Sequence, residues 1–149
     1  MTTISRSALV SYSAEQMYVL VDDIASYPKF LPWCVSAEIL SRDADEVRAV
    51  LELARAGLQK SFTTCNRLQK NKMIEIRLLE GPFRHLEGFW RFDALAPESC
   101  KVSLDMDFEF SNRLVGMVFG PVFHQITNTL VDAFCQRAND MYGKDTVTS

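Results

Sequence analysis

Few side chains in this sequence are of the kinds that carry out catalysis or hold a metal ion. The two histidines are His85, near a Gly-Pro turn, and His124, beside an apolar helical stripe. Neither has a carboxylate at a local spacing that suggests a catalytic pair. The four cysteines are scattered roughly 30 residues apart, whereas a zinc site usually needs closely spaced ligands. The sequence therefore predicts no metal ion, no cofactor and no enzymatic activity.

A segment rich in aromatic residues and proline, YPKFLPW at residues 27–33, is the first candidate for binding an apolar molecule. Its two prolines restrict the backbone, so large rings can line an entrance at a small cost in ordering. The Gly81-Pro82-Phe83 turn is a candidate for the opposite lip. The alternative is that these aromatic rings only fill core space at the open end of a sheet, and the sequence leaves both interpretations open.

Basic and acidic residues are unevenly distributed along the chain. The stretch between residues 55 and 72 contains five basic residues and no acidic residue: Arg55, Lys60, Arg67, Lys70 and Lys72. The strands predicted after it are mainly acidic. These charges are either two solvated strand faces or, for the basic stretch, a hairpin that contacts phosphate groups. No RNA-reading motif such as an RNP box accompanies the basic stretch.

Length and composition indicate one globular domain. The 149 residues are 48% apolar, and the net charge of -3 argues against nucleic-acid binding over the whole surface. The N-terminus lacks the features of a secretory signal, and scattered cysteines suit a reducing compartment, so we expect a cytoplasmic chain. The most apolar window, residues 114–123, is about half the length of a membrane span, so we expect no transmembrane helix. We expect one domain over residues 1–145 and a short flexible tail over 146–149.

Hydrophobic periodicity gives the order of the secondary structure. A two-residue period over residues 4–12 predicts a first strand, and capping-box spacing from Ser13 to Gln16 predicts a short helix over 14–23. Two prolines limit residues 26–34 to a turn or two of helix. Six further strands are predicted, separated by turn residues, over 35–42, 46–56, 58–69, 72–80, 86–95 and 99–110.

The last predicted element is a long helix. Pro121 suits its first turn and Gly143 its C-cap, so we expect a helix over residues 121–142, with 113–119 as a separate turn or a kinked extension. A seven-stranded antiparallel sheet that curls around this helix would cover its apolar stripe. Such an α+β arrangement can leave an apolar cavity between the sheet and the helix.

Several motifs of this sequence occur in the same order in a known family. They are SYPKFLPWC at residues 26–34, KSFTTCN at 60–66, EGPFRHLEGFWRF at 80–92 and DFEFSN at 107–112, followed by the helix from Phe123 to Tyr142. In these motifs the chain resembles the coenzyme-Q-binding START-domain family, a branch of the polyketide cyclase and lipid-transport superfamily. The resemblance covers residues 4–142 and is greatest to the bacterial ribosome-association toxins. Cys65 and His85 depart from the pattern, because relatives often carry basic residues at these positions.

The resemblance implies a START-like helix-grip fold with a hydrophobic tunnel. For the respiratory members of the family it implies ubiquinone or a related polyprenyl lipid as the ligand, and a role that supports respiration. For the toxin branch it implies binding to the large ribosomal subunit, which blocks subunit association and inhibits translation initiation. The two roles can coexist, and the sequence leaves open which one dominates, which lipid is bound and what the oligomeric state is.

The residues and the resemblance together give two candidate sites. The candidates for contact with a hydrophobic ligand between the sheet and the C-terminal helix are Tyr27, Phe30, Leu31, Trp33, Phe83, Trp90, Met106, Phe108, Phe123, Ile126 and Leu130. The candidates for contact with the ribosome are Arg55, Lys60, Arg67, Lys70 and Lys72. The first set is preferred, because the predicted arrangement supplies a cavity for it.

Overall fold

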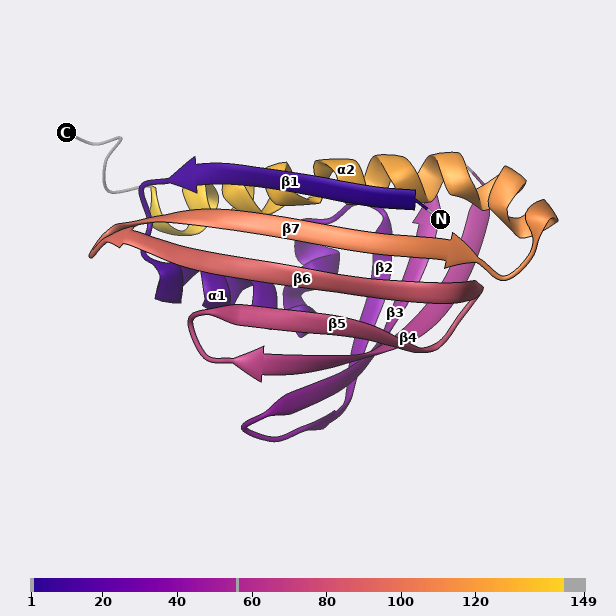
Figure 1. Ribbon diagram of the computed structural model, residues 1–149, viewed down its shortest axis with the longest axis horizontal. Helices are drawn as coiled ribbons and strands as arrows, with labels where there is room; N and C mark the ends of the chain where they lie inside the picture. Colours follow the sequence, from indigo (N-terminus) through magenta and orange to yellow (C-terminus); the bar gives the residue numbers. More distant parts are fainter. Residues whose placement is uncertain (1, 56, 144–149) are drawn as a thin grey trace.

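The computed structural model describes residues 2–55 and 57–143 as one curved sheet with a long helix lying across it (Figure 1). The chain begins with strand β1 (Thr2–Val10), helix α1 (Ala14–Asp22) and the 3₁₀ helix η1 (Ile24–Lys29). The strands that follow are β2 (Cys34–Arg42), β3 (Glu46–Arg55), β4 (Leu58–Gln69), β5 (Met73–Glu80), β6 (Phe83–Ala96) and β7 (Ser99–Phe110). Helix α2 (Arg113–Tyr142) is the last element.

The sheet is antiparallel and has the strand order β1-β7-β6-β5-β4-β3-β2. Strands β2 to β7 form a meander, and β1 pairs with β7 in a register that places Thr2 opposite Phe108 and Val10 opposite Cys100. The predicted seven-stranded sheet curled around a long C-terminal helix, with short helices after the first strand, is therefore confirmed. Because β1 pairs only with β7, and β2 only with β3, these two strands form the edges of the sheet.

One face of the sheet is buried against α2 and the other faces solvent. Strand β7 shows this most clearly, because its even-numbered residues from Cys100 to Phe108 are buried while the odd-numbered residues between them are more exposed. Helix α2 buries Phe123, Phe134 and other residues of one stripe against this concave face. The alternation in the sequence thus determines which side of each strand enters the core.

Helix α1 begins as its sequence predicts. The Ser13 hydroxyl accepts a hydrogen bond from the Gln16 backbone N–H at 3.1 Å, and the Gln16 side chain accepts one from the Ser13 N–H at 2.9 Å. This reciprocal capping box satisfies two N–H groups that a helix terminus would otherwise leave unpaired. The following segment forms η1, so the prediction that prolines allow only a turn or two of helix there is also confirmed.

Helix α2 is longer than the sequence predicted. It begins at Arg113, not at residue 121, because Asn112 caps it: the Asn112 Oδ1 atom accepts a hydrogen bond from the Val115 N–H at 2.9 Å. Pro121 therefore lies inside the helix, where it lacks the N–H of a normal helical residue. Buried Phe119 and Phe123 flank this position, and their packing holds the helix through the proline.

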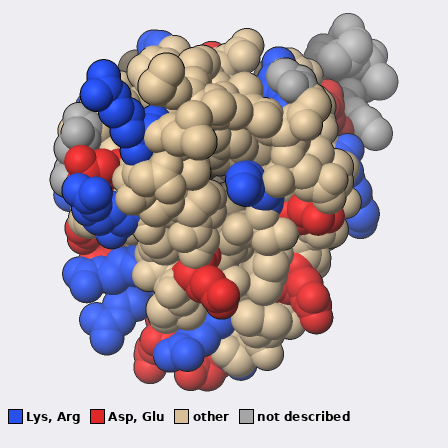
Figure 2. All heavy atoms as spheres, turned by 90° about the vertical axis from the view of Figure 1, so that its right-hand side faces the viewer, with Lys and Arg blue, Asp and Glu red and all other residues tan. Residues whose placement is uncertain are grey.

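The greater length of α2 bears on whether the helix could span a membrane. An 18-residue window of it has a mean hydropathy of 1.2, so among the described residues this one helix is, by length and composition only, long and apolar enough to cross a membrane. One stripe of the helix packs against the concave face, and 28% of the apolar window is buried. At its N-terminal end Leu114 and Met117 are 70% and 68% exposed, and uncharged surface occupies the middle of that end of the molecule (Figure 2).

Smaller differences from the predicted boundaries have local causes. Strand β6 begins at Phe83 and not at residue 86, because Gly81 makes the preceding turn with a φ of +158° and close contact with Phe62. The predicted end of the third strand at residue 56 and the predicted tail over 146–149 fall on residues outside the described ranges.

Candidate ligand-binding cavity

A cavity of about 70 Å³ lies between α2 and the concave face of the sheet. It is lined by residues of η1, of the loop before β2, of strands β3 to β7 and of α2. The lining residues are Ile24, Tyr27, Trp33, Ala49, Leu51, Phe62, Thr64, Asn66, Ile76, Leu86, Trp90, Met106, Phe123, Ile126, Thr127, Leu130 and Phe134. None of these described residues carries a formal charge at neutral pH, so the cavity suits an uncharged, largely apolar molecule.

Aromatic side chains form one wall of the cavity. The ring of Phe134 on α2 lies 5.4 Å from the ring of Tyr27 and 5.2 Å from that of Trp90, edge to face in both cases. The Tyr27 hydroxyl donates a hydrogen bond to the Val21 carbonyl. Burial, reinforced by the nearby Asp22 carboxylate, raises the pKa of Tyr27 above its ordinary value, so this phenol stays protonated.

Three polar side chains interrupt the apolar lining. Thr64 and Asn66 follow Phe62 at two-residue spacing on β4, which brings all three to the concave face. Asn66 is only 7% exposed, and its Oδ1 atom has no hydrogen-bond partner among the described residues. On α2 the Thr127 hydroxyl donates to backbone carbonyls of its own helix, at 3.0 Å from the Phe123 oxygen. The cavity therefore contains a polar region with an unpaired acceptor.

Seven of the eleven residues proposed for ligand contact line the cavity, and their role in binding stays a prediction. They are Tyr27, Trp33, Trp90, Met106, Phe123, Ile126 and Leu130. The other four pack elsewhere. Phe83 and Phe108 belong to a cluster of phenylalanine rings, Leu31 is buried away from the cavity, and Phe30 packs on Phe134 beneath the Arg137 guanidinium.

The sequence interpretation missed the polar residues of the lining. The signal was present, because Thr64 and Asn66 lie at strand spacing after Phe62, within the motif KSFTTCN. Polar residues on the buried side of a strand are uncommon and mark a position where something must satisfy them. Only the structure shows that this strand faces an open space and not a packed helix.

The five basic residues do not form one cluster. Arg55 and Lys60 lie near the β3–β4 turn, whereas Lys70 and Lys72 lie at the β4–β5 turn. Lys60 and Lys70 are at opposite ends of β4, roughly 30 Å apart at about 3.3 Å per residue. Arg67 is near the second turn, paired across the sheet with Glu46 on one side and Glu75 on the other.

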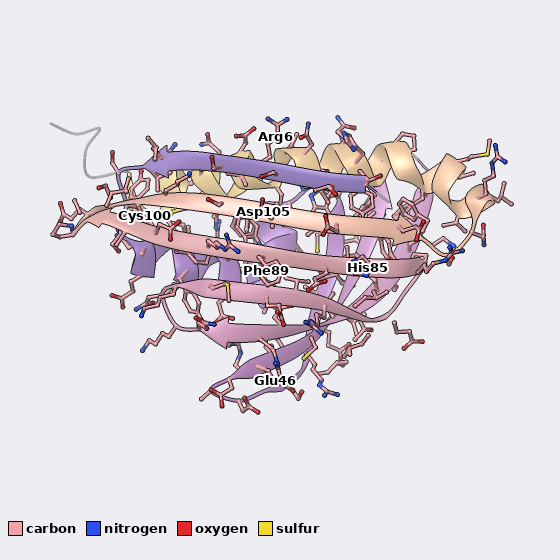
Figure 3. The ribbon with its side chains drawn as sticks, viewed as in Figure 1. Arg6, Glu46, His85, Phe89, Cys100 and Asp105 are labelled. Atoms are coloured by element: carbon pink, nitrogen blue, oxygen red, sulfur yellow. The ribbon has the colours of Figure 1, made fainter. Side chains whose placement is uncertain are left out.

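The histidines lie outside the cavity. His85 is on β6, where its Nε2 atom lies 3.9 Å from Glu87 Oε2. The two side chains meet because residues two apart on a strand lie on the same face of the sheet. Figure 3 shows His85 on the same sheet as Asp105 of β7, and His124 is exposed on α2. Among the described residues, no group of three or more histidine, cysteine or acidic side chains is placed to hold a metal ion.

The sequence is similar to named proteins over nearly its whole length. It is 45% identical over 142 residues to the ribosome association toxin RatA of Escherichia coli K12, covering 95% of this chain and 90% of that protein. It is 29% identical to the mitochondrial coenzyme Q-binding protein COQ10 homolog B of Xenopus laevis, covering 96% of this chain and 60% of that protein.

The fold is shared with solved structures. The Zhui aromatase/cyclase of Streptomyces sp. R1128 superposes with a TM-score of 0.80 at 20% identity, covering 92% of this chain and 93% of that one. At this identity the likeness shows the fold alone. The family described as polyketide cyclase / dehydrase and lipid transport matches residues 10–135, which include all the residues that line the cavity. The chain therefore belongs to the polyketide cyclase / dehydrase and lipid transport family, with the START-like helix-grip fold.

Proposed function

We propose that this protein binds a hydrophobic small molecule, ubiquinone or a related polyprenyl lipid, in the cavity beneath α2. The observation that carries the proposal is an uncharged cavity in the middle of an otherwise densely packed aromatic core. Protein cores seldom leave a void larger than a water molecule, because each void forfeits packing contacts. Family membership and the name of the coenzyme Q-binding relative support a lipid as the occupant.

The size of the cavity limits how the ligand enters. At about 70 Å³ it is smaller than the roughly 300–1,000 Å³ of most ligand pockets. A quinone head group therefore needs the lining to move. Residues 27–33 are suited to move, because Tyr27 and Trp33 line the cavity from a 3₁₀ helix and a loop, not from the sheet or α2.

Binding without catalysis fits the chemistry of the lining. The titratable group of the cavity lining is the Tyr27 phenol. Its pKa is raised by burial, and its hydroxyl donates a hydrogen bond to the Val21 carbonyl. A general acid or base works best with a pKa near the operating pH. The lining therefore provides an apolar surface, and each buried methylene of a polyprenyl tail contributes about 0.8 kcal/mol.

Intrinsic fluorescence tests this proposal directly, because both tryptophans, Trp33 and Trp90, line the cavity. Titration with short-chain ubiquinone should quench their emission saturably. Leu130→Phe, which fills cavity space, should weaken binding by about tenfold or more, while the matched surface substitution Leu114→Phe on the same helix should leave it unchanged. Unsaturable quenching, or equal affinities of wild type and Leu130→Phe, would contradict the proposal.

A second function, association with the ribosome, is favoured by the relatives named ribosome association toxins at 45% identity. We propose that the β4–β5 turn contacts RNA of the large subunit in the cytoplasm and so opposes subunit joining. Lys70 and Lys72 flank Asn71, which has a φ of 63°, and no described salt bridge involves either lysine. Arg67 is a weaker candidate, because Glu46 and Glu75 lie on either side of it.

Co-sedimentation with purified large subunits at two salt concentrations tests this second function. Lys70→Glu with Lys72→Glu should weaken binding and flatten its salt dependence, because each phosphate contact releases counterions. Arg55→Glu with Lys60→Glu, the same charge change at the other end of β4, is the matched control and should bind as wild type does. Leu130→Phe should retain ribosome binding if the two functions use separate sites. Equal binding by both charge-reversed variants would remove the β4–β5 turn from the interface.

A further inference from the structure

Asn66 is a buried residue of the cavity lining whose side-chain oxygen has no hydrogen-bond partner among the described residues. It is more than nine-tenths buried on β4, and its cross-strand neighbours are Val47 on β3 and Ile76 on β5, which are apolar. Its Oδ1 atom accepts no hydrogen bond from the described residues, although the side chain lines the cavity. Leaving a buried amide oxygen unpaired is costly. A group that enters the cavity and donates a hydrogen bond to this oxygen is therefore strongly favoured.

The neighbouring polar groups define what that entering group should be. Thr64, two residues earlier on the same strand, places a hydroxyl in the same lining. The Thr127 hydroxyl already donates a hydrogen bond to the carbonyls of Phe123 and His124, so its oxygen is available to a ligand only as an acceptor. Asn66 Oδ1 therefore has no donor among the described residues, and Thr127 Oγ1 can accept a further hydrogen bond. The polar region of the cavity calls for a ligand that donates.

We infer that the cavity selects ligands with a hydroxyl head group, such as a phenol, a quinol or an alcohol, over ligands whose polar group only accepts, such as an ether or a quinone carbonyl. The inference rests on the proposed binding of a hydrophobic molecule and specifies its head group. A hydroxyl donates to Asn66 Oδ1 and still accepts from the amide N–H or from Thr64. A carbonyl or ether accepts from these donors but leaves the amide oxygen unpaired.

For a quinone that is reduced and oxidised, this preference has a direct consequence. The reduced form carries two hydroxyl groups where the oxidised form carries two carbonyls, so the protein would bind the quinol more tightly than the quinone. By linkage, preferential binding of the quinol favours the reduced form of the bound molecule. Ordered water could also satisfy Asn66, and the experiment below separates water from a ligand hydroxyl.

Calorimetric titration with 4-propylphenol and 4-propylanisole tests the inference, because the two probes share an apolar body and differ in the hydroxyl. We expect wild type to bind the phenol about tenfold more tightly, the ratio that one additional buried hydrogen bond provides. Asn66→Leu should remove this preference, because the variant lacks the amide oxygen to which only the phenol can donate. Thr63→Val is the control on the same strand and should retain the preference, because Thr63 does not line the cavity.

Each result of this experiment has a defined meaning. If wild type binds both probes equally, water satisfies Asn66 and the inference is wrong while the proposed function stands. If the preference survives in a folded Asn66→Leu variant, Asn66 is not its source and the inference is again overturned. If neither probe binds and short-chain ubiquinone also fails, the proposed function and the inference both fall. The wild-type comparison needs no variant, so a folding defect of Asn66→Leu would leave the inference testable.

Discussion

Two regions of the interior lie under the same helix and are packed in opposite ways. Beneath the N-terminal half of α2 is an aromatic cluster, which consists of Phe62, Phe83, Phe108, Phe110, Phe119 and Phe123. Its ring centroids approach to 4.8 Å between Phe108 and Phe123, and no polar atom lies in its side chains. Further along, the cavity holds Thr64, Asn66 and Thr127 beside open space.

The comparison shows that side chains fill the space beneath one part of α2 and leave a cavity beneath another. Strand β4 passes through both regions. Its inward residues change from Phe62, which belongs to the aromatic cluster and also borders the cavity, to Thr64 and Asn66. Large rings fill space and gain edge-to-face contacts, whereas short polar side chains do neither. Two of the residues that border the open space, Thr64 and Asn66, are thus polar residues on the buried face of one strand.

The largest predicted effect is on stability in the aromatic cluster. Phe108→Ala should lower the free energy of unfolding by about 3–5 kcal/mol, because the removed ring leaves a void that the surrounding rings cannot fill. Urea denaturation followed by circular dichroism measures the loss. A loss below about 1 kcal/mol would mean that the cluster is loosely packed and that the contrast with the cavity is wrong.

Trp33→Ala should cost less stability than Phe108→Ala, because one side of Trp33 already borders the cavity and has fewer contacts to lose. The same variant should weaken quinone binding, measured by quenching of the remaining Trp90. The comparison with Phe108→Ala serves as the control. Equal losses of stability together with unchanged quinone affinity would show that Trp33 is a core residue and not part of a gate.

Asn66→Leu should stabilise the protein without ligand by about 1–2 kcal/mol, because it replaces an unpaired buried amide by an apolar group of similar size. The control is Asn128→Leu on α2, where the Oδ1 atom accepts a hydrogen bond from Arg6 Nε at 2.7 Å. That variant should lose stability in thermal unfolding. If Asn66→Leu also loses stability, the Asn66 side chain has a hydrogen-bond partner in the folded protein, and the contrast with the aromatic cluster is wrong.

The smallest predicted effect concerns pH. Burial raises the pKa of the Cys34 thiol to about 11, whereas an unfolded thiol ionises near pH 8.5. The neutral thiol is favoured in the fold, so its contribution is present below pH 8.5 and is lost as the pH rises toward 11. The melting temperature should fall over this range, and Cys34→Ala should reduce the fall by the equivalent of about 1 kcal/mol or less. An unchanged slope would indicate that the thiol is solvated, unlike the rest of the filled core.

The sequence by itself determined the fold and most of its elements. Two-residue alternation from β2 to β7, the capping box at Ser13 and the apolar stripe of α2 are local patterns, and each corresponds to one physical requirement for burial or hydrogen bonding. Tyr27, Trp33 and Trp90, which the family motifs contain, line the cavity, because large aromatic side chains are favoured in the buried interior.

The tertiary structure decided which of these residues face open space. Alternation shows that Asn66 points inward but not what lies opposite, because that depends on how the sheet curls and where α2 crosses it. For the same reason the sequence could not separate Phe108, which is packed among rings, from Met106, which lines the cavity. The sequence left open whether residues 113–119 extend the last helix; the structure shows that they do, because packing on both sides of Pro121 outweighs the local preference of proline. Contacts between residues distant in the chain determine cavities, and such contacts form only when the chain is folded.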